Sequence, residues 1–387
     1  MIVFSFDYPP NDGGIARLCS EIASGLARAG VKLQVLSQLP PDGAQTPPPV
    51  GREIRVTSRR PWREVHAWKE LSRLRGQGLV LCGIWYPEGL LALLAGLRPL
   101  VILAHGSELM PARALWRRGM WRWLCRRVCQ SADLVVANSG YTQRLVLSAA
   151  PRARVAAVPL GVDPLRFRPG DKESAKRRFA AEGRIVLSSV SRLHAYKGHD
   201  TVLRALAELP EAQRRRLLYL IAGKGPSEKE HRKLAQALRL EDQVRFLGFV
   251  PEEDLPELYR ASDLFVLCTR EAAEQQEVEG FGLVFLEAQA CGTPVVGTRT
   301  GGIPDAIREG EGGWLIEQDD AVRLGQILNR LAAEPDEFRA AGRMARQRIE
   351  RECTWDQYLK RLIAVSLVQA AAGVRVAEIS SNPRIPG

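Results

Sequence analysis

The sequence has no apolar run long enough to span a membrane. Its most apolar region, residues 79–104, is interrupted by Pro87, Glu88, Arg98 and Pro99, whereas a spanning helix needs about 20 apolar residues in succession. Residues 1–6 carry no basic segment of the kind that opens a secretory signal, and they are typical of a buried strand. We therefore expect a cytoplasmic protein in which residues 79–104 form a strand, a helix and a strand.

Paired cysteines are also missing. The seven cysteines are scattered and none belongs to a Cys-x-x-Cys pair. Cys125 and Cys129 lie one helical turn apart, without a nearby histidine or further cysteine to complete a set of zinc ligands. We interpret the cysteines as buried, reduced thiols.

Acidic residues are scarce in the first half of the chain. Residues 1–180 contain 27 Lys and Arg against 13 Asp and Glu, a net charge of +14, whereas the remainder carries −3 and the whole chain +11. A one-sided excess of this kind favours an anionic partner such as nucleic acid, an acidic membrane surface or a phosphorylated substrate.

Short apolar runs alternate with helical patterns in two successive passages. The first begins with a strand at residues 2–6 and a helix at 15–29 that places Leu18, Ile22 and Leu26 on one face. Short apolar runs of this kind are typical of parallel strands buried on both faces. Further strands are predicted at 31–37, 79–84, 100–103 and 133–137, and in the second passage at 184–190, 218–223, 244–247, 264–267, 294–298 and 314–316.

A loop rich in Pro, Gly and Arg, residues 159–170, separates the two passages. We place a domain boundary near residue 170, which predicts two doubly wound α/β domains at residues 1–170 and 171–355. Open α/β sheets bind ligands at the carboxyl ends of their strands. We therefore expect the ligand site in a cleft between the two domains.

The segment from Glu279 to Glu287 carries the clearest chemical pattern. If a helix starts near Phe281, then Gly280 and Gly282 leave backbone N–H groups open at its N-terminus, where they favour hydroxyl or phosphate oxygens. Two carboxylates around such a turn suit hydrogen bonds to the hydroxyls of a sugar or ribose. The alternative is structural: Glu279 caps the helix and Glu287 lies in solvent.

Glu279 and Glu287, separated by seven residues within EGFGLVFLEAQACGTPVV, resemble the donor-binding signature of retaining glycosyltransferases of family 4. The resemblance extends to about Leu362. It implies an α/β fold of the GT-B type, with two Rossmann-like domains facing a central cleft and a C-terminal segment, residues 356–387, that returns to the N-domain as a helix before a frayed tail. Further segments match in the family's order, namely Pro9-Pro10 with Gly13-Gly14, and residues 158–163, 190–198, 221–225 and 244–248.

The resemblance implies a role for each matching residue of the C-terminal domain. Glu287 would bind the ribose of the donor nucleotide, and Arg192 and Lys197 would neutralise its diphosphate, where negative charge develops as the leaving group departs. As an alternative, Arg192 and Lys197 form a surface pair after a strand. Glu279 and the backbone that follows it would hold the donor sugar, and the loop after residue 248 would contact the base; the residues concerned are Gly280, Phe281, Gly282, Leu283, Phe249 and Val250.

In the N-terminal domain the resemblance points to His105, Gly13 and Gly14. A histidine in the position of His105 faces the donor sugar in this family, although a lone histidine after a strand is commonly structural. Gly13 and Gly14 would let the backbone approach the diphosphate. The sequence lacks the G-x-G-x-x-G fingerprint of dinucleotide-binding proteins, which argues against a nicotinamide enzyme.

The expected mechanism is front-side attack through an oxocarbenium-like state, in which the departing phosphate helps to deprotonate the acceptor. We nominate no protein nucleophile. We also expect no metal or other cofactor, since Arg192 and Lys197 supply positive charge. Asp319 and Asp320 are interpreted as a surface loop.

Residues 268–270 and 278–280 are most similar, within the family, to bacterial mannosyltransferases that build phosphatidylinositol mannosides and related glycans. We therefore expect GDP-mannose as the donor, with a UDP-sugar as the alternative. The acceptor would be a glycan or a lipid-linked molecule in the synthesis of cell-surface polysaccharide, lipopolysaccharide or glycolipid.

Residues 114–127 combine Trp116, Trp121 and Trp123 with arginines at helical spacing. Such helices commonly lie on anionic membranes, which would place the protein at the inner face of the cell membrane. Alternatively, the tryptophans pack inward and the arginines are solvated. Other functions that we weighed are a nucleic-acid-binding protein, supported by charge alone, a sugar-nucleotide epimerase and an inactive donor-binding module.

Overall fold

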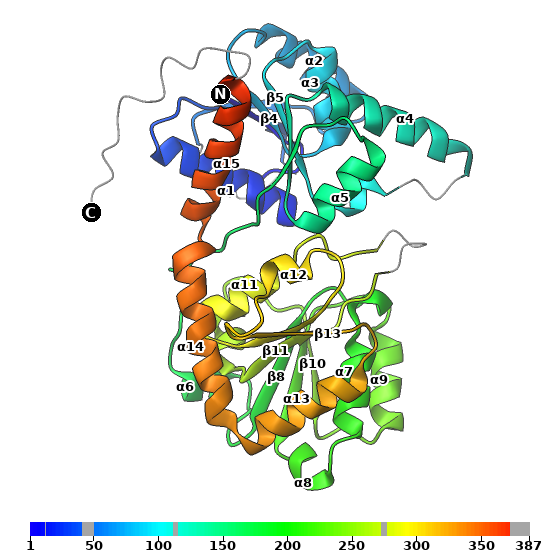
Figure 1. Cartoon of the computed structure of the whole chain (residues 1–387), viewed down its shortest axis with the longest axis vertical. Helices are drawn as coiled ribbons and strands as arrows, with labels where there is room; N and C mark the ends of the chain where they lie inside the picture. The colour runs from blue at the N-terminus through cyan, green and yellow to red at the C-terminus, as the bar shows by residue number, and fades with distance from the viewer. Residues whose placement is uncertain (12, 41–49, 111–114, 272–276, 372–387) are drawn as a thin grey trace. The chain divides into compact units, whose positions relative to one another are not determined.

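The computed structural model describes the whole chain except residues 12, 41–49, 111–114, 272–276 and 372–387 (Figure 1). The chain divides into two compact units. Unit 1 combines Met1–Val158 with Trp355–Gly387, and unit 2 is Pro159–Thr354.

Unit 1 is built on a seven-stranded parallel sheet with the strand order β3-β2-β1-β4-β5-β6-β7. The chain moves outward from β1 to β3 and then crosses back to β4, so the order reverses between β1 and β4, as in doubly wound folds. The strands are β1 (Ile2–Phe4), β2 (Gln34–Gln38), β3 (Arg52–Val56), β4 (Val80–Cys82), β5 (Leu100–Ala104), β6 (Leu134–Ala137) and β7 (Val155–Ala157).

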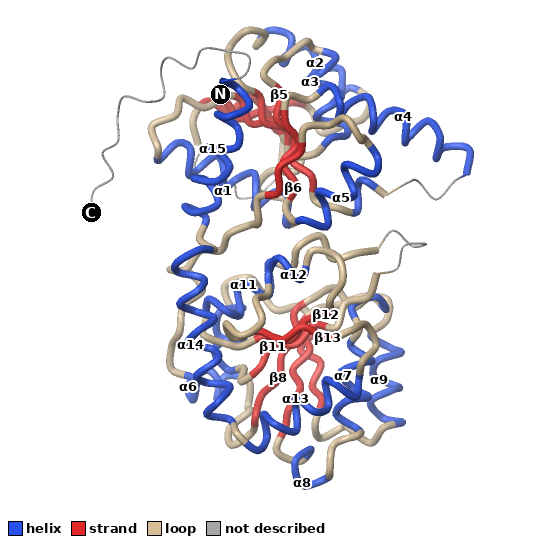
Figure 2. The backbone as a smooth tube through the Cα atoms, in the orientation of Figure 1, coloured by secondary structure: helices blue, strands red, loops and turns tan. Residues whose placement is uncertain are grey.

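Helices cover both faces of this sheet (Figure 2). The core on one face includes Phe4, Ile102 and Trp85, which pack with α2 to α5, and α1 packs against the C-terminal helix α15 (Figure 1). The helices are α1 (Gly14–Arg28), α2 (Trp62–Arg73), α3 (Leu90–Leu94), α4 (Leu115–Ser131), α5 (Gly140–Ala149) and α15 (Trp355–Ala371), with short turns η1 (Trp85–Gly89) and η2 (Ser107–Leu109).

Unit 2 repeats the plan with six parallel strands in the order β10-β9-β8-β11-β12-β13, which reverses between β8 and β11. The strands are β8 (Ile185–Val190), β9 (Leu217–Ala222), β10 (Val244–Gly248), β11 (Leu264–Leu267), β12 (Val295–Thr298) and β13 (Gly313–Ile316).

The larger core of unit 2 lies between this sheet and the helices α7, α9 and α13. A smaller apolar cluster on other residues of β8 and β9 packs with Leu258 of α10. The helices are α6 (Lys172–Arg178), α7 (His199–Ala207), α8 (Glu211–Arg214), α9 (Glu228–Ala237), α10 (Leu255–Ala261), α11 (Leu283–Ala290), α12 (Ile303–Ala306), α13 (Ala321–Ala333) and α14 (Pro335–Glu352), with one turn η3 (Ala195–Lys197).

The prediction of two doubly wound α/β units is confirmed, and residues 79–104 form β4, α3 and β5 as expected. The predicted boundary at residue 170 differs from the observed division, because residues 159–170 pack with unit 2. Arg346 of α14 donates hydrogen bonds to the carbonyls of Pro164 and Phe167, and the amide of Val162 donates to the carbonyl of Cys353.

Two edge strands, β3 and β7, are absent from the sequence-based prediction. β3 has the sequence REIRV and only its last residue is buried, while the residues of β7 are half-buried. Neither forms the continuous apolar run by which the inner strands are recognised. All seven cysteines are buried and free. Within the described part of the chain, no helix combines the length and the apolarity needed to cross a membrane.

Packing of α15 on α1 depends on Gly25. A Cβ atom at this position would lie 3.2 Å from Cγ of Leu359 and closer still to one of its methyl groups, and Leu359 is itself buried. We expect Gly25→Ala to lower the free energy of unfolding by about 1 kcal/mol or more through overpacking.

The matched control is Gly119→Ala in the exposed part of α4, where no atom lies within 4 Å of the new methyl group. It should raise the free energy of unfolding by up to about 1 kcal/mol, as alanine does in exposed helices. Urea denaturation of both variants measures the difference. Equal stabilisation by the two substitutions would contradict the packing of α15 on α1.

Candidate active site

In unit 2 the predicted donor residues gather where the strand order reverses. Arg192 and Lys197 follow the carboxyl end of β8, and Glu279 lies in the connection from β11 to α11. Lys197 is buried, and its Nζ lies 2.6 Å from Oε2 of Glu279. Burial by itself lowers the pKa of Lys197, but the Glu279 carboxylate outweighs this and holds the pKa above its usual value. The ammonium group is therefore charged at neutral pH.

The loop that carries Lys197 is held by Gly198 and Arg270. Gly198 adopts a left-handed conformation with φ 70°, and a side chain there would collide with the carbonyl of Cys268. The Arg270 guanidinium donates to the carbonyl of Ala195 at 3.0 Å and pairs with Asp200 at 2.7 Å. From the sequence, Arg270 served only in the comparison of donors. Its position three residues after a strand could have marked it as part of the site.

Helix α11 begins at Leu283, two residues later than expected, with Gly282 as its N-cap at φ 89° and without a side-chain cap. Glu279 therefore does not cap this helix. Glu287 is 4% exposed and accepts a hydrogen bond of 2.8 Å from the Tyr259 hydroxyl. The structural alternative for the two glutamates, a cap and a solvated side chain, is wrong on both counts.

The remaining predicted donor residues lie at the same edge of the sheet. Arg192 is exposed. Phe249, directly after β10, is 69% exposed, whereas Val250 packs against the smaller apolar cluster. Gly280 is half-buried and Phe281 is buried. Of these predicted side chains, the structure brings Lys197 and Glu279 into direct contact. The ligand contacts of all of them stay predictions.

In unit 1, His105 and the glycine loop lie at the strand ends beside the reversal between β1 and β4. His105 Nε2 is 2.7 Å from the carbonyl of Gly83, so this nitrogen carries the proton and donates it. Gly13, the N-cap of α1, has φ 141°, and the Asp7 carboxylate lies 3.9 Å from the position of its missing Cβ. Burial raises the pKa of Asp7, an effect that His105 partly offsets. Gly14 is exposed at the start of α1. Asp7 is a polar residue beside the glycine loop that was not among the predicted site residues.

A second carboxyl group, that of Glu88, binds the backbone of the segment that leads from β1 to the glycine loop. Glu88 is 3% exposed, and its Oε1 accepts a hydrogen bond of 3.0 Å from the amide of Phe6. The guanidinium of Arg63 lies 4.0 Å over the Phe6 ring. Burial raises the pKa of Glu88 to about 7.

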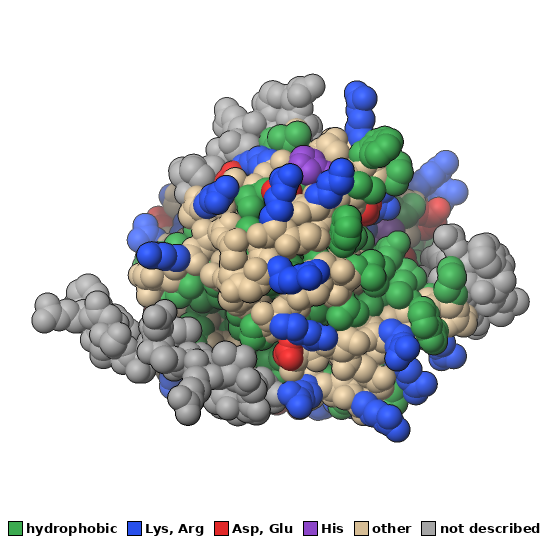
Figure 3. Space-filling model, turned by 90° about the horizontal axis from the view of Figure 1, so that it is seen from above, with side chains coloured by type: hydrophobic (Ala, Val, Ile, Leu, Met, Phe, Trp, Pro, Cys, Tyr) green, Lys and Arg blue, Asp and Glu red, His purple; other side chains and the backbone are tan. Residues whose placement is uncertain are grey.

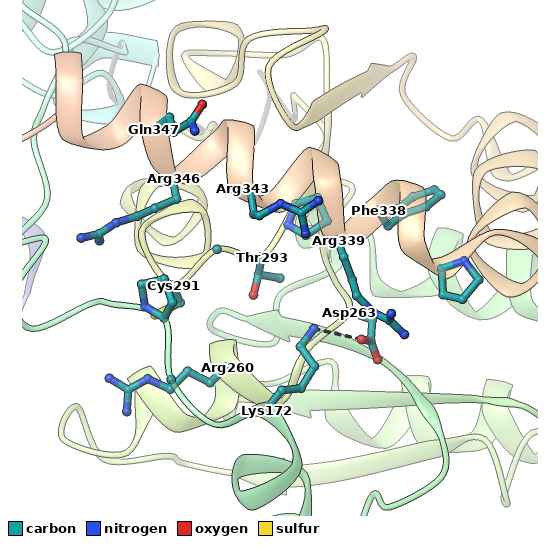
Figure 4. Close-up of a pocket in the computed structure, with 15 residues that line it drawn as sticks. Lys172, Arg260, Asp263, Cys291, Thr293, Phe338, Arg339, Arg343, Arg346 and Gln347 are labelled. Carbon is teal, nitrogen blue, oxygen red and sulfur yellow. Dashed lines mark hydrogen bonds and ion pairs between the residues drawn. The ribbon is translucent and has the colours of Figure 1, made fainter.

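Unit 2 also contains a cavity of about 370 Å³ that is separate from these residues (Figure 4). Its lining includes Asp263 and Pro294, which directly precede β11 and β12 and so lie at the amino ends of the strands. Its charged groups are largely paired, since Lys172 lies 2.9 Å from Asp263 and Arg346 donates to three carbonyls. None of the predicted site residues lines this cavity.

Comparison with known proteins identifies the family. Residues 12–166 match the family described as Glycosyltransferase Family 4, and residues 171–348 match the family described as Glycosyl transferases group 1. The chain is also 31% identical over 281 residues, 70% of each chain, to a GDP-mannose-dependent alpha-(1-6)-phosphatidylinositol monomannoside mannosyltransferase of Mycobacterium tuberculosis. The chain belongs to glycosyltransferase family 4. It is a hexosyltransferase.

A protein of the same description from Mycolicibacterium smegmatis is 34% identical over 264 residues, which are 66% of each chain. The match thus spans about two thirds of that relative's length. Among solved structures, Anabaena HepE in complex with UDP superposes with a TM-score of 0.74 at 20% identity, covering 95% of this chain and 99% of that one. At this identity the likeness concerns the fold, and it confirms the GT-B architecture of the family 4 chain.

The raised pKa of Glu88 predicts how the stability of unit 1 depends on pH. The pKa of the folded state, about 7, lies above the ordinary value of 4.5, so the folded state binds the proton more tightly. The resulting stabilisation is fully present below pH 4.5 and is lost as the pH rises to about 7. Between pH 5 and 7.5, wild-type protein should lose about 2 kcal/mol of unfolding free energy relative to Glu88→Gln.

Urea denaturation of both proteins at the two pH values measures this difference. The glutamine variant retains an acceptor for the Phe6 amide and does not titrate, so it isolates the ionisation of Glu88 from the loss of the side chain. Parallel changes in the two proteins would show that Glu88 ionises normally in the folded state.

Proposed function

We propose that this family 4 enzyme transfers a mannosyl residue from GDP-mannose, with retention of configuration, to a lipid-linked or glycan acceptor. The observation that carries the proposal is the contact between the buried Lys197 and the half-buried Glu279, at 2.6 Å, at the strand reversal of unit 2. It places a cation suited to a diphosphate beside a carboxylate suited to sugar hydroxyls. The choice of GDP-mannose is supported by the relatives from the two mycobacteria, whose names state this donor.

The geometry supports a reaction without a protein nucleophile. The Lys197 ammonium group is charged and buried, and a fixed cation stabilises the charge that develops on the departing diphosphate. Arg192 is exposed at the same edge of the sheet, where its guanidinium can form bidentate hydrogen bonds to phosphate oxygens. With these two cations we propose that the reaction proceeds without a metal ion, so activity should persist in EDTA.

The acceptor would bind unit 1, which carries the basic excess. On α4, Trp121 packs inward with its ring 4.5 Å from that of Trp85, whereas Trp123 is 59% exposed. The side chain of Trp116 lies outside the described residues. Trp121 thus packs against the core, as the inward-packing alternative predicts, whereas Trp123 is exposed and is available for the membrane contact that we propose.

Helix α2 adds further exposed apolar side chains. Trp62 is 68% exposed, and Val65 and Trp68 lie three and six positions further along the helix, both more than one third exposed. Seen from the end of unit 1 that carries α2, apolar side chains lie among many Lys and Arg side chains and few acidic ones (Figure 3). Exposed tryptophans among cations suit the interface of an anionic membrane. We propose that unit 1 rests on such a membrane, where a lipid-linked acceptor is available.

Nucleotide binding tests the donor. In isothermal titration calorimetry with GDP, UDP and ADP, GDP should bind most tightly. Glu287→Ala should weaken GDP binding about 10- to 100-fold, because a charged hydrogen bond to ribose hydroxyls is lost. The control Glu241→Ala, at an exposed glutamate between α9 and β10, should bind GDP like wild-type protein.

Two results would count against this assignment. Tighter binding of UDP than of GDP, together with faster hydrolysis of UDP-glucose than of GDP-mannose, would show that the donor is a UDP-sugar and not GDP-mannose. Unchanged GDP affinity in Glu287→Ala would remove Glu287 from the ribose site.

Flotation with liposomes tests the membrane contact. The protein should float with vesicles that contain anionic phospholipid at low salt, and less at high salt because the attraction is screened. Replacement of both Trp68 and Trp123 by Ser should reduce flotation severalfold, whereas Leu165→Ser, at a 79% exposed residue of unit 2, should not. Absence of flotation at low salt would refute the contact.

A further inference from the structure

A chain of buried hydrogen bonds runs beneath the loop that carries Arg192 and Lys197. Ser189 on β8 donates its hydroxyl proton to the carbonyl of Val266 on β11. Its oxygen lies 2.6 Å from the hydroxyl of Tyr219 on β9, and that hydroxyl lies 2.9 Å from Nδ1 of His199. On the other side of the imidazole, Nε2 lies 2.9 Å from the hydroxyl of Ser191. Ser189, Tyr219 and His199 are each 0% exposed.

The direction of each hydrogen bond follows from the first. Because Ser189 gives its only proton to a carbonyl, it must accept from Tyr219. The Tyr219 oxygen then accepts a hydrogen bond from the N–H group at Nδ1 of His199. Nε2 of the neutral imidazole is left as an acceptor for the hydrogen bond from the Ser191 hydroxyl. The Ser191 hydroxyl also lies 3.1 Å from the carbonyl of Arg192. If the Ser191 hydroxyl donated to the Arg192 carbonyl instead, Nε2 of a neutral His199 would remain a buried acceptor without a donor, which would lower the stability of the fold.

The charges around His199 favour this neutral form. Burial is the largest of the effects that together lower the pKa of His199 to about 3; His231 and Lys197 act in the same direction, and Asp200 opposes them. The ring of His231 lies 5.4 Å from that of His199. A neutral imidazole has one donor and one acceptor at separate points of a rigid ring, which is what the Tyr219 and Ser191 hydroxyls require here.

The chain ends at the residue that precedes Arg192. Ser191 is also bonded through its backbone, since its amide donates to the carbonyl of Ala222 at 3.1 Å. On the far side of Arg192, the amide of Leu193 donates to the carbonyl of Lys224 at 3.0 Å. The backbone of Arg192 is thus held on both sides, and the hydrogen bond from the Ser191 hydroxyl to His199 fixes the residue that directly precedes Arg192.

We infer that His199, as the neutral imidazole with its proton on Nδ1, is a positioning residue for the donor diphosphate site and acts through Ser191 on Arg192. The inference rests on the proposed function, because it assigns the diphosphate to Arg192 and Lys197. His199 also begins α7 directly after Lys197 and Gly198, so a single side chain ties both ends of the cation-bearing loop to the sheet.

The test compares Ser191, which directly follows β8, with Ser188 within β8. Ser191→Ala removes the hydroxyl bonded to His199. Ser188→Ala removes a buried hydroxyl that accepts a hydrogen bond of 2.6 Å from Ser262, a residue that precedes β11 and so lies toward the opposite edge of the sheet. Ser191→Ala should raise the KM for the nucleotide-sugar donor and the Kd for its nucleoside diphosphate about fivefold, whereas Ser188→Ala should change neither and affect stability alone.

A spectroscopic measurement tests the tautomer without any donor. In ¹⁵N-labelled protein, one of the five histidines should show the pattern of a neutral ring protonated on Nδ1, unchanged between pH 5 and 8, and Tyr219→Phe should alter that signal. A ring protonated on Nε2, or one that titrates in this range, would overturn the inference.

The outcomes separate this inference from the proposed function. If wild-type protein binds a nucleoside diphosphate and Ser191→Ala binds it as tightly as Ser188→Ala does, the positioning role is refuted and the proposed function stands. If wild-type protein binds no nucleoside diphosphate, the proposed function fails and the positioning role fails with it, whatever the tautomer of His199.

Discussion

The contact between Lys197 and Glu279 is the interaction on which the proposed donor site of unit 2 depends. It joins the loop after β8 to the connection that leads into α11, so the two halves of the site meet at the reversal of strand order. Neither group would be stable there alone, because an isolated buried charge is costly. A bound donor would give each group a new partner, the diphosphate for the lysine and the sugar hydroxyls for the glutamate. The pair thus keeps the lysine charged and both side chains in place, ready for the donor that we propose.

Several features of the surrounding structure serve this arrangement. Gly198 permits the close approach of the loop to β11, and Arg270 fastens it to Asp200. Tyr259 holds the buried carboxylate of Glu287 from the adjacent helix α10. Asp200 and Tyr259 lie in helices α7 and α10, so the loops that carry Gly198 and Arg270 are anchored to regular elements, which suits a site that must hold several charged groups in fixed positions.

Much of the fold, and the positions of the residues proposed to bind the donor, could be predicted from the sequence, because both rest on local patterns. The inner strands are short, continuous apolar runs, and the spacing of Glu279 and Glu287 is visible directly. The edge strand β3 was missed because three of its five residues, in the sequence REIRV, are charged and only the last residue is buried. The burial of Glu287 and its bond to Tyr259 were missed because these residues are 28 positions apart. Asp7, Glu88 and His199 were missed for the same reason: their significance lies in neighbours that only folding brings together.

The division of unit 1 into two separate stretches of sequence has a consequence for synthesis of the protein. Residues 159–354, which form unit 2, are inserted between the main part of unit 1 and its last helix α15. The face of α1 that carries Gly25 stays uncovered until Leu359 has left the ribosome. Domains usually fold in the order of their synthesis, but here unit 2 has all of its residues before unit 1 does. The N-terminal unit is therefore the last to be completed, and a chain that stops before α15 would leave an apolar helix face open to aggregation.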